Sequence, residues 1–241
     1  MIVSERHPKY VFLQFPQAAS TAIARELVEH YEGRRILRKH SNYRHFERWA
    51  GSSAGEFFTF SSIRNPLEKQ VSLYHKFRSN HQGHFTNPGS WRRNGGWISN
   101  RELRRYRYIT ERDARFEDFF RRYFWLPFVD WSVLAHKELD FIIRYESIQE
   151  DFSRALDALG LQQIRPLPRG NPSKKKGDPD PSSLYPDAMR RRGCWVLGPM
   201  LEYWDYPVPP GWACRPSTMV PARLTFRCLS VLKSWYYHYL W

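Results

Sequence analysis

The sequence predicts an α/β fold, a single domain in which helices flank a parallel β-sheet. Short apolar runs rich in aromatic and β-branched residues alternate along the chain with segments of helical periodicity, the pattern of strands joined by crossover helices. The chain has 241 residues, the size of one domain. Hydrophobic residues make up 41% of it, which supplies a core and excludes a disordered protein.

Four apolar runs are expected to form the strands. They span Tyr10–Phe15, Arg35–Lys39, Phe57–Ile63 and Asp140–Tyr145. Ser20 or Thr21 is expected to cap the helix after the first strand, and Pro66 suits the first turn of the helix after the third. Further helices are expected at residues 42–50, 116–123, 147–160 and from about 183 onward.

Two regions lack clear periodicity and are expected to be loops. Residues 83–96 are rich in Gly, Asn, Pro, Trp and Arg, which indicates a long loop with short helical pieces. The wider segment 76–107 holds eight Lys or Arg residues and a single acid, Glu102. Long loops in compact domains are usually functional or mobile, so this basic segment is a candidate for substrate contact. The second loop, residues 165–182, is rich in Pro and Lys.

The net charge indicates which kinds of partner the protein binds, and the cysteine content indicates the redox state of its cellular compartment. Lys and Arg number 38 against 24 Asp and Glu, a formal charge of +14, which favours anionic partners. Cys194, Cys214 and Cys228 are far apart and lack a C-x-x-C spacing, so we expect neither a disulfide framework nor a zinc site. Such cysteine usage fits a reducing compartment. No signal peptide or membrane span is predicted, and the expected location is cytoplasmic.

The connection between the first strand and its helix has the composition of an anion site. Small side chains at Ala18, Ala19 and Ser20 let a ligand approach the backbone, and the first amides of a helix point outward at the positive end of its dipole. The hydroxyls of Ser20 and Thr21 can add donors. An ordinary capped turn is the alternative. The G-x-x-x-x-G-K-[ST] spacing is absent, which argues against a kinase or ATPase.

A second candidate site follows the third strand. Arg64 stands at the carboxyl end of that strand, where ligands bind in α/β sheets, and Ser72 lies eight residues further on. An arginine fork and a hydroxyl suit a second phosphate group. Alternatively, Arg64 pairs with a carboxylate and Ser72 is merely small on a packed helix face.

Three stretches in this order resemble the sulfotransferase superfamily, which uses 3′-phosphoadenosine 5′-phosphosulfate. They are FLQFPQAASTAI at Phe12–Ile23, SSIRNPLEKQVSLYHKF at Ser61–Phe77 and DFIIRYESIQEDFSRALDALGL at Asp140–Leu161. The resemblance implies a P-loop-like parallel sheet, this nucleotide as cofactor, no metal, and transfer of a sulfuryl group to a hydroxyl acceptor. The acceptor class is expected to be a carbohydrate, including an anionic glycan, or a small molecule.

The resemblance also implies roles for single residues. The 5′-phosphosulfate would be held by the segment Gln17, Ala18, Ala19, Ser20, Thr21 and Ala22. Arg64 and Ser72 would hold the 3′-phosphate. A late basic loop closes over this phosphate in several branches of the family, which assigns the role to Lys174, Lys175 and Lys176. A solvated run of charge is the alternative for these lysines.

Gln17 departs from the family pattern, which carries a lysine directly after the proline. That lysine is expected to stabilise charge on the bridging oxygen as the sulfuryl group leaves. Three readings stay open. Gln17 suffices, another cation such as Lys39 or Lys9 substitutes, or the chain binds the nucleotide with weak turnover or none.

His40 is the candidate base that takes the proton of the acceptor hydroxyl. It ends the second predicted strand at the same sheet edge as Gln17 and Arg64, and histidine titrates near neutral pH. Its position is similar to that in the carbohydrate-type branch of the family. A surface or capping role is the alternative, and His75 and Glu146 are the competing side chains.

The remaining candidate surfaces are basic and aromatic. Trp91, Arg92, Arg93 and Trp97 are predicted to contact the acceptor, because indole faces stack on sugars and arginines pair with anions. The same mixture suits nucleic acid, but no recognised nucleic-acid module is present. Residues 222–241 are predicted to form a basic amphipathic helix that lies on a membrane surface or packs on protein. The expected division is a domain at 1–213 and this tail at 214–241.

Overall fold

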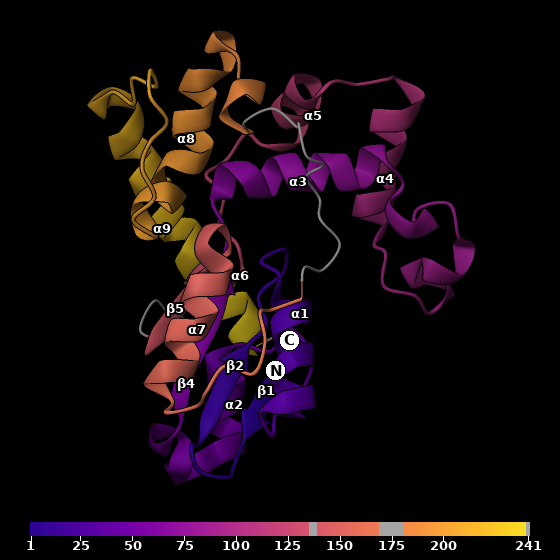
Figure 1. Ribbon diagram of the computed structural model, residues 1–241. Coiled ribbons are helices and arrows are strands. Elements are labelled where there is room, and N and C mark those ends of the chain that lie inside the picture. Colours follow the sequence, from indigo (N-terminus) through magenta and orange to yellow (C-terminus); the bar gives the residue numbers. More distant parts are fainter. Residues whose placement is uncertain (135–138, 169–180, 240–241) are drawn as a thin grey trace. The chain divides into compact units, whose positions relative to one another are not determined.

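The computed structural model in Figure 1 describes residues 1–134, 139–168 and 181–239. The chain forms two compact units built from interleaved segments. The first unit comprises Met1–Asn65, Val129–Asn171 and Arg227–Trp241, and the second comprises Pro66–Phe128 and Pro172–Phe226. The expected division at residue 213 stays a prediction.

The first unit carries a five-stranded sheet in the order β3-β1-β2-β4-β5. The strands are β1 (Ile2–Ser4), β2 (Tyr10–Leu13), β3 (Arg34–Arg35), β4 (Phe58–Ile63) and β5 (Phe141–Arg144). β2 and β4 pair in parallel, as do β4 and β5, whereas β1 runs antiparallel to both β2 and β3. The expected α/β class is confirmed. The expected parallel pairing holds for β2, β4 and β5, and the antiparallel β1 makes the sheet mixed. Because β1 alone is reversed, β3 runs in the direction of β2.

Two strand predictions need correction. β1 is absent from the predicted set, because three residues are too few for a periodic signal. The short connection from β1 to β2 allows only an antiparallel pair. The predicted strand Arg35–Lys39 shrinks to Arg34–Arg35, since Leu37 has a φ of 52°, a left-handed conformation that interrupts an extended strand. Lys39 and His40 therefore lie in a turn.

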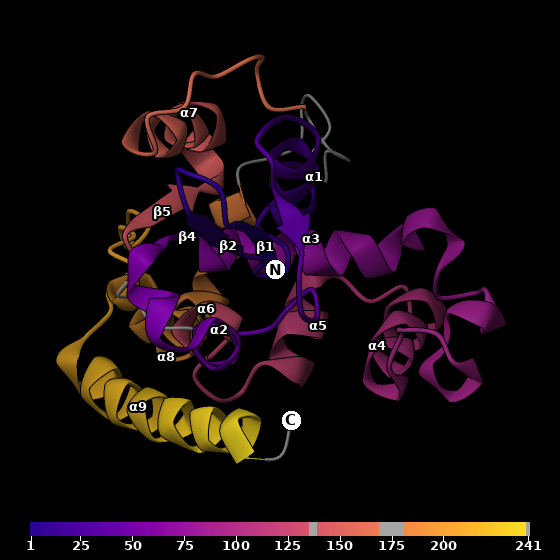
Figure 2. The same cartoon turned by 90° about the horizontal axis from the view of Figure 1, so that it is seen from below.

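Helices cover both faces of this sheet. In the first unit they are α1 (Ser20–His30), α2 (Tyr43–Ala50), α6 (Trp131–Leu134) and α7 (Ile148–Ala158). Figure 2 shows α1 and α7 on one face of the sheet and α2 on the other. The core between sheet and helices includes Phe12 and Phe60 from the strands, Leu27 from α1 and Phe152 from α7. Burying each such side chain contributes about 1.5–3 kcal/mol.

An ion pair between Glu26 and Arg165 lies at the edge of this core. Glu26 of α1 is 1% exposed, and its carboxylate accepts hydrogen bonds from Arg165 Nε at 3.0 Å and Nη2 at 2.9 Å. The fork geometry compensates a carboxylate that burial alone would destabilise. Arg165 thereby ties the segment after α7 to α1.

The second unit is helical. Its helices are α3 (Pro66–Arg78), α4 (Asn100–Glu111), α5 (Phe116–Tyr123), α8 (Asp187–Tyr203) and the first part of α9 (Pro216–Tyr239). Short 3-10 turns lie between α3 and α4, as expected for residues 83–96. The expected loop at 76–107 is wrong for residues 100–107, which belong to α4, because Ser99 and Glu102 form a capping box that starts a helix there. No helix in the described part of the chain is both long enough and apolar enough to cross a membrane.

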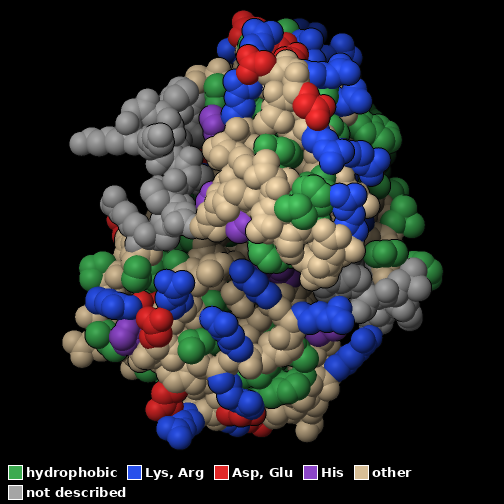
Figure 3. All heavy atoms as spheres, turned by 90° about the vertical axis from the view of Figure 1, so that its right-hand side faces the viewer, with side chains coloured by type: hydrophobic (Ala, Val, Ile, Leu, Met, Phe, Trp, Pro, Cys, Tyr) green, Lys and Arg blue, Asp and Glu red, His purple; other side chains and the backbone are tan. Residues whose placement is uncertain are grey.

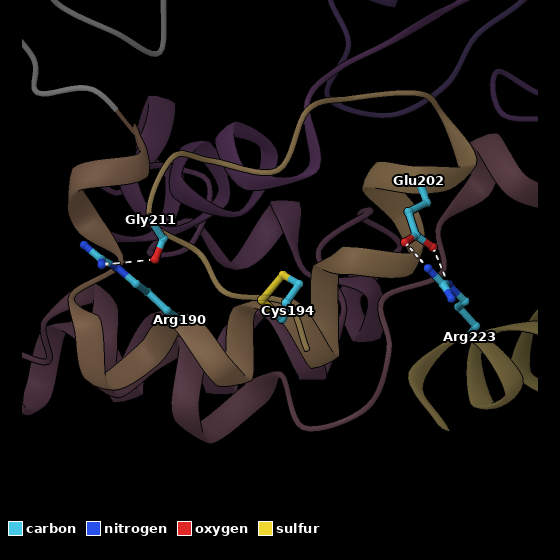
Figure 4. The surroundings of a disulfide bond; sticks show 6 residues. Arg190, Cys194, Glu202, Gly211 and Arg223 are labelled. Atoms are coloured by element: carbon cyan, nitrogen blue, oxygen red, sulfur yellow. Dashed lines mark hydrogen bonds and ion pairs between the residues drawn. A yellow bond between two sulfur atoms is a disulfide. The ribbon is translucent and has the colours of Figure 1, made fainter. Parts of the chain in front are cut away.

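A disulfide joins Cys194 of α8 to Cys214 in the segment that precedes α9, with their Cα atoms 5.4 Å apart (Figure 4). The expectation that the cysteines do not pair is wrong for these two, because α8 and the returning chain bring together residues that are 20 positions apart. Cys228 is free and exposed. The argument from unpaired cysteines for a reducing, cytoplasmic compartment therefore no longer holds.

Candidate functional site

Two strand ends meet at one edge of the sheet in the first unit. β2 and β4 are parallel neighbours, and Leu13 lies opposite Ser61. The connection to α1 begins after Leu13, and Arg64 directly follows β4. Both segments therefore leave the sheet at its carboxyl edge, where ligands bind in α/β proteins.

The connection from β2 to α1 folds back on itself and is held by side chains. Gln17 and Ala19 have φ values of 65° and 53°, a left-handed conformation that costs about 1–2 kcal/mol for a residue other than glycine. Ser20 Oγ donates to the oxygen of Phe15 at 2.6 Å, and Gln14 Nε2 donates to the oxygen of Ser20 at 3.3 Å. Backbone strain that is maintained by such braces is typical of functional sites. The hydroxyl proton of Ser20 is thus engaged within the loop.

The first turn of α1 is suited to an anion. Ala19 is the N-cap residue, without a side-chain cap, and the amides of Ala22 and Ile23 both donate to its oxygen. The preceding helical amides, those of Ser20 and Thr21, have no acceptor inside the helix. No acidic residue lies in this turn, so amides and helix dipole present positive charge at this point.

The turn after β3 contributes two side chains to this connection. Lys39 Nζ donates to Thr21 Oγ1 at 3.0 Å, and His40 Nδ1 lies 2.7 Å from the backbone oxygen of Gln14. A carbonyl oxygen only accepts, so Nδ1 of His40 carries a proton. Desolvation and, second, the charge of Arg35 hold the pKa of Lys39 below its ordinary value, although the side chain as a whole is exposed.

Arg64 is buried at the end of β4, with 8% of its surface exposed. Its guanidinium carbon lies 4.2 Å from the ring centre of Tyr145, which follows β5. This stacking fixes the plane of the guanidinium, a planar group whose donor geometry matches that of a phosphate. Glu146 accepts from the amide of Asn65 at 2.7 Å, a structural contact that holds the turn after β4.

Three further predictions concern residues outside the loop and the turn after β4. Lys9 precedes β2, at the opposite edge of the sheet from the loop, and its Nζ pairs with Glu56 at 2.5 Å. Ser72 belongs to α3 in the second unit and is half-buried. Lys174, Lys175 and Lys176 lie outside the described residues.

The predicted acceptor residues occupy the basic segment of the second unit. The indole N–H of half-buried Trp91 donates to the oxygen of Phe85 at 3.2 Å, whereas Trp97 is 61% exposed. Arg92 and Arg93 are exposed, and Arg93 stacks over Trp91 at 4.5 Å. On the face drawn in Figure 3, Lys and Arg side chains outnumber acidic ones.

One group of side chains in the described residues has metal-ligand spacing. Glu26, Glu29 and His30 bring their ligand atoms within 4.8 Å of one another. However, Arg165 already pairs with Glu26 and with Glu29. A metal cation at this place would have to displace the guanidinium of Arg165. We therefore assign these carboxylates to the ion pairs with Arg165 and not to a metal site.

A family model described as the sulfotransferase family matches residues 1–183 of the chain. The chain belongs to the sulfotransferase family. No curated protein and no solved structure matches it. The matched range contains every strand of the sheet, the loop after β2, His40 and Arg64. Family membership supports a sulfotransferase activity, a transferase reaction that needs a sulfate donor and an acceptor.

Two residues that sequence reasoning missed organise this candidate site. Gln14 contacts both the loop, through Ser20, and His40, while Tyr145 supports Arg64. A polar residue inside the apolar run at Tyr10–Phe15 was the available signal for Gln14. For Tyr145 no signal existed, because its ring meets Arg64 through the pairing of β4 with β5.

Proposed function

We propose that this sulfotransferase transfers a sulfuryl group from 3′-phosphoadenosine 5′-phosphosulfate to a hydroxyl acceptor, a carbohydrate or a small molecule. The observation that carries the proposal is the adjacency of two anion-binding features at one sheet edge. The first turn of α1 follows β2, and Arg64 follows the neighbouring parallel strand β4. A nucleotide with phosphate groups at both ends of its ribose needs two such features.

The donor atoms at this edge fit the nucleotide. They are backbone amides, an ammonium and a guanidinium, and the first turn of α1 adds no carboxylate. The segment from Gln17 to Ala22 would hold the 5′-phosphosulfate, whereas Arg64 with Ser72 would hold the 3′-phosphate. Lys175 and Lys176 remain proposed for the same phosphate. When bound, the nucleotide supplies an activated sulfuryl group.

His40 is proposed to accept the proton of the acceptor hydroxyl at Nε2. The hydrogen bond from Nδ1 to Gln14 sets both the tautomer and the direction of the ring. A hydroxyl must lose its proton as its oxygen attacks sulfur, and a positioned imidazole supplies the base at neutral pH. No metal is needed for these roles.

The acceptor is proposed to contact Trp97, Arg92 and Arg93, with Trp91 as support. Trp97 presents an exposed ring that packs edge-on against His84 with centroids 5.2 Å apart. An exposed indole in the same segment as two exposed arginines suits a sugar that carries negative charge. A nucleic acid is the less favoured partner.

We also propose peripheral contact of α9 with an anionic membrane surface. Val220, Leu224, Val231 and Trp235 are 51–68% exposed and fall on one side of the helix by their spacing. Arg227 is exposed beside them. Sedimentation with anionic vesicles tests this contact, and a Leu224→Ser, Trp235→Ser variant should lose it. Undiminished sedimentation of that variant would reject it.

Gln17 favours one alternative function, a sulfotransferase-like protein that binds the nucleotide with weak turnover. Two measurements separate the readings. Calorimetry should show tighter binding of adenosine 3′,5′-bisphosphate than of adenosine 5′-monophosphate, and equal affinities would reject the nucleotide site. Transfer of labelled sulfate to a panel of glycans and phenols should be detectable, and its absence despite tight binding would favour the alternative.

A further inference from the structure

We propose that Lys39 supplies, from the turn after β3, the positive charge that the loop lacks at position 17. Lys39 would contact the sulfated end of the bound nucleotide directly. This inference rests on the proposed function and names a residue that acts within it. The observation behind it is the position of Lys39 beside the first turn of α1.

The ammonium group of Lys39 lies beside the first turn of α1, at the end of the loop that carries Gln17. Lys39 Nζ lies 3.0 Å from Thr21 Oγ1, on the second residue of α1. The first amides of α1 point outward at the same place. An anion held by these amides would therefore lie within reach of Nζ. Gln17, on the same loop, offers only an uncharged amide.

The surroundings of Lys39 disfavour a cation unless an anion joins it. Helix N-termini carry positive partial charge, and Arg35 adds a full positive charge nearby. Among the residues that the structure describes, Lys39 makes no ion pair; its hydroxyl partner Thr21 is neutral. A phosphosulfate would remove this conflict, because it is the missing counter-charge.

The other lysine considered for this role does not reach the site. Lys9 precedes β2, so it lies at the opposite edge of the sheet, and it is paired with Glu56. Lys39 instead follows β3, which runs in the direction of β2 and ends at the same edge as the loop. The order of the strands thus decides between the two lysines.

The role of such a cation follows from charge development during transfer. As the sulfuryl group leaves, negative charge grows on the bridging oxygen, and a preorganised charged donor lowers the barrier. Removing one such donor typically costs about 10²–10³-fold in rate. Lys39 would also strengthen binding of the 5′-phosphate, and that effect is measurable without turnover.

The test compares the affinities of two nucleotides by calorimetry. Adenosine 3′,5′-bisphosphate carries the 5′-phosphate, and adenosine 3′-monophosphate lacks it. Lys39→Met should lower the affinity for the bisphosphate by about 10–100-fold and leave that for the monophosphate unchanged, because one charged hydrogen bond is lost. Lys39→Arg should keep most of the affinity. Lys9→Met, at the opposite sheet edge, is the matched control and should bind both normally.

A charge-exchange variant gives an independent readout. Gln17→Lys in the Lys39→Met background returns a cation to the loop and should restore both bisphosphate affinity and turnover in part. Suppose that the wild-type protein prefers the bisphosphate to the 3′-monophosphate and that Lys39→Met binds the bisphosphate as tightly as the wild type. This result overturns the role of Lys39 and leaves the proposed function intact. A wild-type protein with no such preference overturns both. Thermal melts establish that each variant is folded.

Discussion

His40 donates a hydrogen bond from Nδ1 to the backbone oxygen of Gln14, at 2.7 Å. Gln14 also donates through its side chain to the oxygen of Ser20, the first residue of α1. The candidate base and the candidate anion site are therefore built on the same residue. Loss of either hydrogen bond is therefore expected to disturb both the candidate base and the candidate anion site.

Substituting His40 separates chemistry from positioning. His40→Asn keeps an N–H donor for Gln14 but removes the base, so turnover should fall about 10²–10⁴-fold while nucleotide affinity stays the same. Steady-state kinetics and calorimetry measure the two effects. If His40→Asn has normal turnover and only His40→Ala is impaired, His40 is a positioning residue and not the base.

Arg64 is expected to confer the preference for a 3′-phosphate. Arg64→Ala should lower the affinity for adenosine 3′,5′-bisphosphate about 10–100-fold and abolish its advantage over adenosine 5′-monophosphate, since a charged donor is lost. Arg64→Lys should recover little, because the flat guanidinium stacks on Tyr145. Arg34→Ala, on the edge strand β3, is the control. Unaltered selectivity in Arg64→Ala would rule out this role.

Nucleotide affinity should decline in alkaline solution. The pKa of Lys39 is held below its ordinary value of 10.5, so its charge is lost as pH rises through that lowered pKa. The bisphosphate affinity should therefore begin to fall before an ordinary lysine would titrate. Lys39→Arg stays charged and should remove the decline. Calorimetry across this range checks the expectation, which fails if both proteins decline alike.

In the protein without nucleotide, deprotonation of Lys39 at rising pH should increase the free energy of unfolding, whereas it lowers nucleotide affinity. A lysine whose folded pKa is lowered destabilises the folded state while it is charged, and this penalty disappears as pH rises toward the unfolded pKa. Bound nucleotide should raise the pKa of Lys39, so binding within this window should take up protons. Calorimetry in buffers of different ionisation enthalpy detects the uptake.

The disulfide should stabilise the second unit. Cys194 and Cys214 close a loop across 20 positions, and such a cross-link contributes about 3 kcal/mol in the chain-entropy estimate. Cys194→Ala with Cys214→Ala should lower the free energy of unfolding by about that amount in denaturant titrations. Cys228→Ser, at an exposed free thiol, should change nothing. Three titratable thiols in the native, unreduced protein would contradict the bond.

The two tryptophans of the basic segment should differ in effect. Trp91→Ala should lower stability by about 1–3 kcal/mol, because its indole N–H bond to Phe85 and its half-buried ring are lost. Trp97→Ala should leave stability unchanged and raise KM for a carbohydrate acceptor about two- to tenfold. Thermal melts and kinetics with the acceptor found by the sulfate screen distinguish them. A KM unaffected by Trp97→Ala would remove Trp97 from the acceptor site.

Local sequence patterns were sufficient where a structure depends on neighbours in the chain. Apolar runs predicted β2, β4 and β5, and Pro66 correctly marked the start of α3. The pattern did not reveal the direction of β1 or the end of β3 at Arg35, since both depend on pairing with other strands. Nor did it separate Trp91 from Trp97, which differ in burial and not in composition.

The amino-acid sequence alone determined the family and the approximate positions of the candidate anion-binding loop, Arg64 and His40, because these follow from short motifs at strand ends. Only the tertiary structure decided which lysine lies beside the loop, which cysteines are bonded and which nitrogen of His40 carries the proton. The physical reason is that a motif encodes a local conformation, whereas each of these contacts joins residues from separate segments. Distance along the chain does not record the distance between them in the fold.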